Sequence, residues 1–215
     1  MTRVKVCGIT RPEDAALAVE LGAWALGFIL WEGSPRAAEP DVVAGIVAAH
    51  RRRVETVGVF VDPTLDEVAA AVDGLGLSMV QLHGEVGPVF ATEVARRTGA
   101  RVIRAFRIGS GADVQDTDRF RFADFHLFDA RVKGLHGGSG ETWDWGLLRS
   151  RRAKVPLILA GGLTADNVAE AIGQVHPHAV DVASGVEASP GVKDPDKVRA
   201  FLESAAATDR GGVHA

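Results

Sequence analysis

Cys7 is the only cysteine of this chain, and it has the position of a reactive group in an α/β enzyme. It ends the apolar run Val4–Cys7, Gly8 follows at once, and the residues from Thr10 onward begin a predicted helix. The thiolate of such a cysteine is chemically reactive. An isolated cysteine at the end of a strand, however, is more often a small buried apolar side chain. The choice between these interpretations depends on which side chains meet Cys7.

Further polar and small residues follow other apolar runs. Arg36 lies in a loop fixed by Ser34-Pro35, and its planar guanidinium suits a carboxylate or a phosphate. Asp129 follows Phe125–Phe128, and no obvious helix begins there for it to cap. The other candidates are Gln81, His83, Gly161, Gly162, Asp181, Ser184 and Gly185.

Composition limits the class of protein. Hydrophobic residues make up 47% of the 215 residues, which is enough for a large core. A net charge of −4 argues against a dedicated nucleic-acid binder. One cysteine excludes an intrachain disulfide and a multi-cysteine metal site, and the histidines lack metal-ligand spacing, so we expect no metal. We find no signal segment and no long apolar run, and we therefore expect a cytoplasmic protein without a membrane segment.

Apolar strands alternate with amphipathic helices along the chain, which predicts an α/β fold. The predicted strands are Val4–Cys7, Trp24–Ile29, Val54–Val61, Met79–Leu82, Val102–Phe106, Phe125–Phe128, Leu157–Ala160 and Ala179–Val182. Helices are predicted to include Pro12–Leu21, Asp41–His50, Pro88–Arg97, Thr164–Ile172 and Pro195–Ser204.

Eight such units close naturally into a (β/α)8 TIM barrel of parallel strands. We expect one domain over residues 1–205, with a flexible tail at 206–215. The fifth helix, within Gly109–Asp118, should be short or poorly formed, because the segment is polar and weakly periodic. An open doubly wound sheet is the alternative, but the glycine-rich phosphate loop that it would place after the first strand is missing.

A barrel would gather these candidates at the carboxyl ends of its strands, where barrel enzymes have their active sites. Gly161-Gly162 and Ser184-Gly185 would follow the seventh and eighth strands, the usual position of a phosphate site. Glycine lets backbone N–H groups approach an anion, and the predicted helix from Thr164 would point its positive end at the first loop. His83 is either a contact to the ligand or a structural histidine, and we favour the second.

Several motifs in combination resemble the phosphoribosylanthranilate isomerase family, from Val4 to about Phe201. They are Lys5-Val6-Cys7-Gly8-Ile9-Thr10, Gln81-Leu82-His83-Gly84, the segment from Gly137 to Trp145, Ala160-Gly161-Gly162-Leu163, and the segments 181–187 and 190–194. Two departures are visible: Trp143 stands where the family often has phenylalanine, and Ala37-Ala38 stands where a larger residue often follows the arginine.

The resemblance implies an Amadori rearrangement of N-(5-phosphoribosyl)anthranilate, with Asp129 as the acid and Cys7 as the base. It also implies that Arg36 binds the anthranilate carboxylate and that the two glycine loops bind the phosphate, with Gln81 and His83 as further substrate contacts. Lys5 and Asp181 are possible auxiliary residues, and Gly137, Gly138 and Ser139 belong to a possible lid. No cofactor is expected, and the only predicted partner is the small phosphosugar, bound by a monomer or homodimer.

Three other interpretations remain. A histidine-pathway or dual-specificity aminoaldose isomerase would use an aspartate at the position of Cys7. A pentose-phosphate epimerase would bring metal-binding histidines to the strand ends. A non-catalytic phosphosugar-binding barrel would keep the phosphate loops and lose the acid and the thiol.

Overall fold

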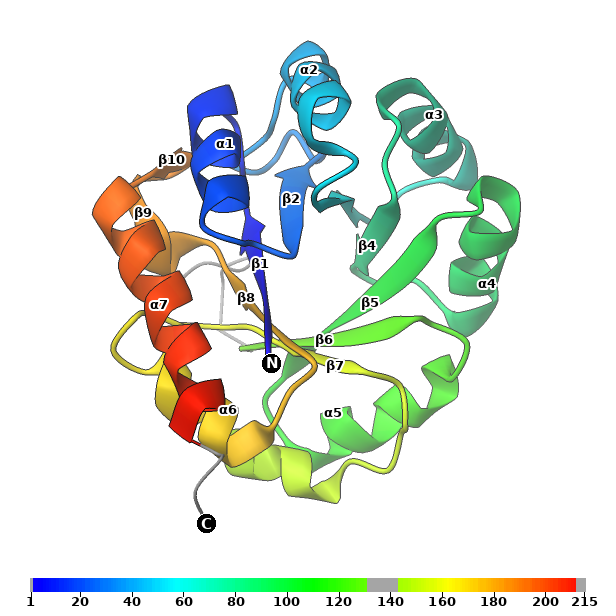
Figure 1. Cartoon of the computed structure of the whole chain (residues 1–215). Helices are drawn as coiled ribbons and strands as arrows, with labels where there is room; N and C mark the ends of the chain where they lie inside the picture. Colours follow the sequence, from blue (N-terminus) through cyan, green and yellow to red (C-terminus); the bar gives the residue numbers. More distant parts are fainter. Residues whose placement is uncertain (1, 131–142, 212–215) are drawn as a thin grey trace.

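Short apolar runs form the strands of this protein, because parallel strands covered by helices are buried on both faces. The structure, a computed structural model, describes residues 2–130 and 143–211. Its parallel strands close a barrel in sequence order from β1 to β8 (Figure 1). They are β1 (Arg3–Cys7), β2 (Ala25–Ile29), β3 (Glu55–Val61), β4 (Met79–His83), β5 (Arg101–Ile108), β6 (Phe125–Ala130), β7 (Leu157–Leu159) and β8 (Ala179–Val182). The predicted barrel is confirmed, and the open sheet is excluded because β1 pairs with both β2 and β8.

Helices surround the barrel, and local sequence explains where several of them begin. The α-helices are α1 (Pro12–Glu20), α2 (Pro40–His50), α3 (Leu65–Leu75), α4 (Pro88–Thr98), α5 (Gly111–Asp116), α6 (Val168–Val175) and α7 (Pro195–Gly211). Proline in the first turn starts α1, α2 and α4, since its fixed φ suits that position. Thr64 and Glu67 form a capping box at the start of α3.

Shorter elements complete the chain. The 3-10 helices within the described residues are η1 (Thr117–Phe120), η2 (Trp145–Ser150) and η3 (Ser184–Val186). Beyond β8, β9 (Glu187–Ser189) pairs antiparallel with β10 (Val192–Lys193). None of the helices within residues 2–130 and 143–211 combines the length and the apolar character needed to cross a bilayer.

Two groups of buried side chains hold the barrel together. One fills the space between strands and helices and includes Phe28, Val47, Phe128 and Phe201. The other fills the barrel interior and consists of Cys7, Ala25, Val57, Val59, Met79, Ile103, Ala105, Phe125, Leu127, Ile158, Ala160 and Ala179. Cys7 is therefore an inward-pointing residue at the upper end of the interior group, where the strands stop and a ligand can enter.

The structure differs from the predicted elements mainly at their ends; β6, for example, continues to Ala130, beyond the predicted Phe128. Helix α6 begins at Val168 and not at Thr164, because the Asn167 side chain holds a separate turn: its Oδ1 accepts from the Thr164 N–H at 2.9 Å. Strand β5 continues to Ile108, beyond the predicted end. Helix α7 continues to Gly211 and takes in part of the segment that we expected as a tail, while residues 212–215 lie outside the described residues. The fifth helix is short, as expected.

Candidate active site

The carboxyl ends of the barrel strands surround a cavity of about 510 Å³. Cys7 at the end of β1 and Asp129 near the end of β6 both line it. The other candidates from the sequence that line it are Arg36, Gln81, His83 and Asp181. The cavity therefore brings together a thiol, a carboxyl and a guanidinium from residues that are distant in sequence, and it is large enough for a small ligand.

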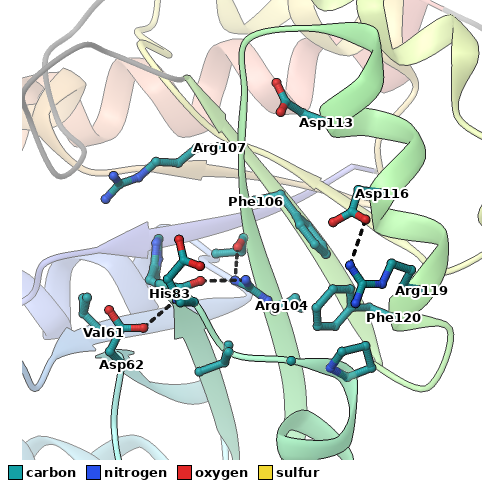
Figure 2. Close-up of a pocket in the computed structure, with 16 residues that line it drawn as sticks. Val61, Asp62, His83, Arg104, Phe106, Arg107, Asp113, Asp116, Arg119 and Phe120 are labelled. Carbon is teal, nitrogen blue, oxygen red and sulfur yellow. Dashed lines mark hydrogen bonds and ion pairs between the residues drawn. The ribbon is translucent and has the colours of Figure 1, made fainter.

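A larger cavity of about 700 Å³ lies beside the first, between the loop after β4, strand β5 and α5 (Figure 2). The two cavities share Val61, His83 and Arg107. The larger one is lined by neither Cys7 nor Asp129. Because proton-transfer chemistry needs an acid and a base within reach of one ligand, we place the chemistry in the smaller cavity.

Lys5 forms a buried ion pair with Asp181 next to the thiol. The Lys5 Nζ donates to Asp181 Oδ1 at 2.9 Å, and the Lys5 side chain is fully buried. Burial lowers the pKa of Lys5, but the charges of Asp181 and Cys7 outweigh burial and hold that pKa above its ordinary value. Lys5 therefore remains a cation beside Cys7, and it both pairs with a carboxylate and acts on the thiol.

The surroundings of Cys7 act on its pKa in opposite directions. Burial raises the pKa of the Cys7 thiol, Lys5 and Lys193 lower it, and burial prevails. Gly27, opposite Cys7 on β2, leaves the space that the thiol occupies. A Cβ on Gly27 would lie 2.7 Å from Cys7 Sγ and 3.0 Å from Lys5 Nζ. Glycine is therefore the residue that the position requires.

Asp129 is a carboxyl whose protonated form is favoured. Burial raises its pKa to about 6, and Asp181 contributes to the rise, although a hydrogen bond from the Ala130 N–H opposes it. Gly161 gives this carboxyl room: it has φ +90°, and a Cβ there would lie 2.8 Å from Asp129 Oδ1. A carboxyl with this pKa can hold a proton near neutral pH and release it to a ligand.

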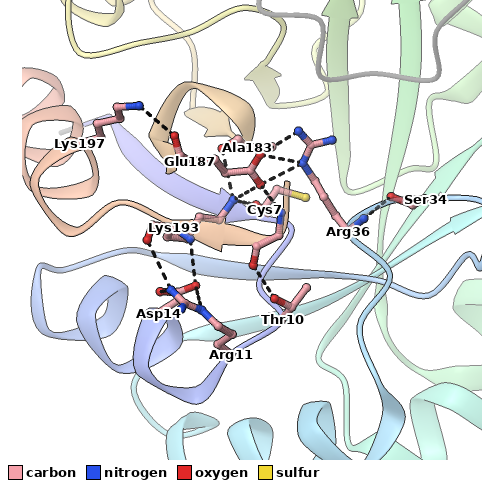
Figure 3. A network of polar contacts seen from close by, with 11 residues as sticks. Cys7, Thr10, Arg11, Asp14, Ser34, Arg36, Ala183, Glu187, Lys193 and Lys197 are labelled. Carbon is pink, nitrogen blue, oxygen red and sulfur yellow. Dashed lines mark hydrogen bonds and ion pairs between the residues drawn. The ribbon is translucent and has the colours of Figure 1, made fainter. Parts of the chain in front are cut away.

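Arg36 belongs to a polar network that links the loop after β2 with β1, β9 and β10 (Figure 3). Its Nε and Nη2 donate to the carboxylate of Glu187 at 2.8–3.0 Å. Lys193 Nζ donates to the same carboxylate at 3.0 Å and to the Cys7 carbonyl oxygen at 2.6 Å. Burial raises the pKa of Glu187, but Arg36 and Lys193 outweigh burial and hold that pKa below its ordinary value. The network fixes Arg36 at the cavity and anchors the backbone of Cys7.

Gln81 and His83 contact each other at the cavity wall. Gln81 Nε2 lies 2.7 Å from His83 Nε2. Gln81 is 2% exposed, and its Oε1 has no hydrogen-bond partner among the described residues. A buried acceptor without a partner is costly, so a donor from a ligand in the cavity would satisfy it.

The two glycine loops lie next to each other but do not line the cavity of Cys7. Gly162 also has a positive φ, +66°, and its carbonyl accepts from Asn167 Nδ2 at 2.9 Å. A side chain on Gly185 would collide with the carbonyl oxygen of Leu163. On this side, among the described residues, Ala183 lines the cavity in place of Ser184 and Gly185. The helix that the sequence placed directly behind the first glycine loop begins only at Val168.

The lid predicted at Gly137, Gly138 and Ser139 lies outside the described residues. Trp143, the first residue described after that segment, donates from Nε1 to the Ala160 carbonyl at 3.0 Å. Its indole thus packs against the end of β7. Among the described residues, no group of three His, Cys, Asp or Glu side chains has a geometry that could hold a metal ion.

Sequence reasoning missed Arg107 and gave no role to Glu187 and Lys193. Arg107 stands directly opposite Asp129 in the β5–β6 ladder and lines the cavity. The alternation of side chains along the strand could have identified it: Ile103 and Ala105 point into the barrel, so Arg107, two residues further, points to the same side. Glu187 and Lys193 lie within quoted motifs, but only their burial, at 7% and 2% exposure, identifies them as a buried pair.

Comparison with known proteins gives consistent matches over nearly the whole chain. Residues 4–204 match the family model of N-(5'-phosphoribosyl)anthranilate isomerase. A protein of that name from Pelobacter propionicus is 45% identical over 208 residues, which cover 97% of either chain. Another, from Chromohalobacter salexigens, is 47% identical over 208 residues, 96% of this chain and 95% of its own.

Solved structures agree with the sequence matches. Phosphoribosyl anthranilate isomerase from Thermotoga maritima has a TM-score of 0.88 at 38% identity, with 96% of this chain and all of that chain covered. A structure of such an isomerase in complex with reduced 1-(o-carboxyphenylamino)-1-deoxyribulose 5-phosphate has a TM-score of 0.85 at 36% identity and the same coverage.

Proposed function

The chain belongs to the N-(5'-phosphoribosyl)anthranilate isomerase family, and from that premise we propose that Cys7 and Asp129 are the base and the acid of its reaction. The reaction is an intramolecular aldose–ketose isomerisation in tryptophan biosynthesis. It converts N-(5'-phosphoribosyl)anthranilate to 1-(o-carboxyphenylamino)-1-deoxyribulose 5-phosphate. The observation that carries the assignment is that this thiol and this carboxyl line one cavity at the mouth of the barrel.

Asp129 acts first, as the acid. It donates its proton to the ribose ring oxygen, the bond from that oxygen to C1 breaks, and the nitrogen lone pair forms a Schiff base with C1. A group can supply this proton only if it is protonated part of the time at the working pH. The pKa of Asp129, raised to about 6 chiefly by burial, meets that condition better than that of an ordinary carboxyl.

Cys7 acts second, as the base. Its thiolate removes the proton from C2, and the electrons of that C–H bond form the C1–C2 double bond of an enolamine. The enolamine then tautomerises to the ketone, so no atom is gained or lost overall. Lys5 and Lys193 stabilise the thiolate that this step needs, against the opposing effect of burial.

The raised pKa of each group has a consequence for the state that reacts. Asp129 titrates near pH 6 and Cys7 above its ordinary range, so the main form at neutral pH has a carboxylate and a neutral thiol. The reactive form, with a carboxylic acid and a thiolate, has the same net charge and is a minor tautomer of it. Any change that raises the pKa of Asp129 or lowers that of Cys7 should increase the reactive fraction.

The remaining candidates serve substrate binding in this proposal. Arg36 faces the anthranilate carboxylate, and Gly161, Gly162, Ser184 and Gly185 supply backbone N–H groups to the phosphate. Gln81 Oε1, which lacks a partner among the described residues, accepts from a ribose hydroxyl, with His83 orienting the amide. Anchoring both ends of the substrate places the ribose between acid and base. The small phosphosugar is the expected partner. We further propose that the protein is a monomer or a homodimer and that it is located in the cytoplasm.

Turnover by the unmodified chain tests the function. Freshly prepared N-(5'-phosphoribosyl)anthranilate should lose its fluorescence in the presence of the protein, and the product should be the ketose. The aminoaldose substrate of the histidine pathway serves as the matched control. Turnover of that compound without turnover of N-(5'-phosphoribosyl)anthranilate would contradict the proposal and favour the alternative isomerase.

A further inference from the structure

Arg104 is a buried guanidinium that takes no part in the proton transfers. It stands opposite Leu82 in the β4–β5 ladder and is 7% exposed. Its neighbours Ile103 and Ala105 point into the barrel, so its own side chain lies on the outer face of β5. Burial lowers the pKa of Arg104 to about 10, which still leaves it a cation at neutral pH. A buried charge is costly unless polar groups compensate it, so its partners indicate what the residue does.

The partners of Arg104 are main-chain carbonyls on both sides of His83. Nη1 donates to the carbonyl of Leu82 at 3.0 Å and also to that of Ala105, and Nη2 donates to the carbonyl of Gly84 at 2.8 Å. In Figure 2 the guanidinium reaches the backbone next to His83. One planar group thus holds the residue before His83 and the residue after it, which the fork geometry of arginine permits.

Two aromatic rings restrict the guanidinium further. Its Cζ lies 4.9 Å from the centre of the Phe106 ring and 5.1 Å from that of the Phe120 ring. Both distances are within the range of a cation–π interaction. Because rings and carbonyls contact the same group from different elements, we expect Arg104 to keep one orientation and to transmit it to the end of β4.

The strand on the other side of β4 holds the carbonyl of His83 itself. The Asp62 N–H, after the end of β3, donates to the His83 carbonyl at 3.3 Å. Asp62 Oδ1 also accepts from the Glu85 N–H at 2.5 Å. Asp62 makes these contacts with φ +46°, a conformation that is uncommon outside glycine. The carbonyls of residues 82, 83 and 84 are therefore held in turn by Arg104, Asp62 and Arg104.

We propose that Arg104 is a positioning residue for the reaction: it acts through the main chain on His83, and through His83 on Gln81. The inference rests on the proposed function and adds a residue that lines the larger cavity and not the smaller one. His83 lines both cavities, and its Nε2 lies 2.7 Å from Gln81 Nε2. Without Arg104 the backbone at His83 would shift, the Gln81 amide would turn, and the ribose hydroxyl would lose its acceptor.

A double-mutant cycle tests whether Arg104 acts through His83. Arg104→Met should lower kcat/KM for N-(5'-phosphoribosyl)anthranilate about 10-fold in the original protein and less than about 2-fold in His83→Ala, where the positioned group is absent. Arg119→Gln is the matched control, because Arg119 lines the same larger cavity but pairs with Asp116 and is 66% exposed. It should change kcat/KM in neither background. A purely structural role of Arg104 predicts the same loss in both backgrounds, and that result would overturn the proposal.

A second readout does not require turnover. The chemical shifts of the His83 imidazole nitrogens, assigned by their disappearance in His83→Ala, report its surroundings in the ligand-free protein. They should move in Arg104→Met and in Arg104→Gln, and they should stay in place in Arg119→Gln. The glutamine variant covers the case in which Arg104→Met does not fold, since its amide retains a donor but is too short to reach both carbonyls. Unchanged His83 signals in a folded Arg104 variant would overturn the role of Arg104. Turnover by the unmodified chain decides the proposed function separately.

Discussion

The Nζ of Lys5 donates to Asp181 Oδ1 at 2.9 Å in the floor of the cavity, with both side chains withdrawn from solvent and Cys7 two residues away on the same strand. Because Cys7 and Lys5 lie on the same face of β1, the ammonium group acts on the thiol as well as on the carboxylate. The charge of Lys5 thus acts on the Cys7 thiol, on its ion-pair partner Asp181 and on Asp129. Its removal should affect both stability and the reactivity of the thiol.

Lys5→Met should raise the pKa of the Cys7 thiol, since Lys5 is a cause that lowers it. The rate of alkylation of Cys7 by iodoacetamide, measured against pH, reports that pKa directly because the chain has one cysteine. The variant also leaves Asp181 buried without its partner, which should lower the free energy of unfolding by about 3–5 kcal/mol. Lys154→Met, at an exposed position, is the control. An alkylation profile unchanged from the original protein would rule out the electrostatic role of Lys5.

Gly27→Ala should reduce kcat by about 100-fold, because the new Cβ would lie 2.7 Å from Cys7 Sγ and must displace it. Steady-state kinetics measure the effect, and circular dichroism checks the fold. Gly45→Ala, in the middle of α2, is the matched control, since a Cβ there meets nothing within 4 Å. That variant should keep full activity and gain about 0.5–1 kcal/mol of stability. A Gly27→Ala protein as active as the control would show that the thiol position is not critical.

Ionisation of Asp129 should destabilise the fold. Its pKa in the folded state is about 6, raised from 3.8 mainly by burial. The carboxyl is therefore protonated in the folded protein at pH values where it is ionised in the unfolded chain, and this stability is lost as the pH rises through about 6. Asp129→Asn does not ionise, so its stability relative to the original protein should increase between pH 4 and 7 by about 3 kcal/mol. Urea unfolding at several pH values measures the difference. A difference that does not change with pH would mean that Asp129 titrates in its ordinary range.

Glu187→Gln should destabilise the protein by about 3 kcal/mol at neutral pH, because it leaves Arg36 and Lys193 without their shared anion. The pKa of Glu187 is held below its ordinary value. Its contribution is therefore complete above the ordinary carboxyl pKa and is lost as the pH falls through the lowered value. KM should rise as well, since Arg36 loses its orientation. Glu170→Gln, on the exposed surface of α6, is the control. Unchanged stability and KM in Glu187→Gln would show that the contacts of Glu187 with Arg36 and Lys193 neither stabilise the fold nor orient Arg36.

The barrel could be predicted from sequence because each strand is a local apolar run whose burial does not depend on details elsewhere. The ends of helices and strands were harder to predict, because they depend on which side chains bind the nearby backbone groups, and an apolar run carries no information on that. Thr164 is a plausible helix cap by type, but the Asn167 side chain binds the Thr164 N–H and forms a turn there, which delays α6. Likewise β5 extends past Phe106 because its next residues continue the ladder with β6, although Arg107 is charged.

The candidate site could be predicted where a chemically reactive residue type stands at the end of an apolar run, as Cys7 and Asp129 do. The contacts between charged side chains at the site were harder to predict from sequence. Arg36 could be placed at the cavity from sequence, but its contact with Glu187 joins residues 151 positions apart, and nothing local indicates it. The same holds for Lys193, whose contact with the Cys7 carbonyl depends on the turn between β9 and β10. Arg107 was missed for a different reason: it lies beyond Phe106, the predicted end of its strand, whereas β5 continues to Ile108.

The central claim is that Cys7 and Asp129 carry the proton transfers, and turnover of N-(5'-phosphoribosyl)anthranilate by Cys7→Ala and Asp129→Asn tests it most directly. Each variant should lose about 10²–10⁴-fold in kcat, the range expected for one acid or base group, and should bind the reduced product analogue within a few-fold of the original protein. A variant that keeps the analogue and a kcat close to that of the original protein would contradict the assignment of the replaced residue.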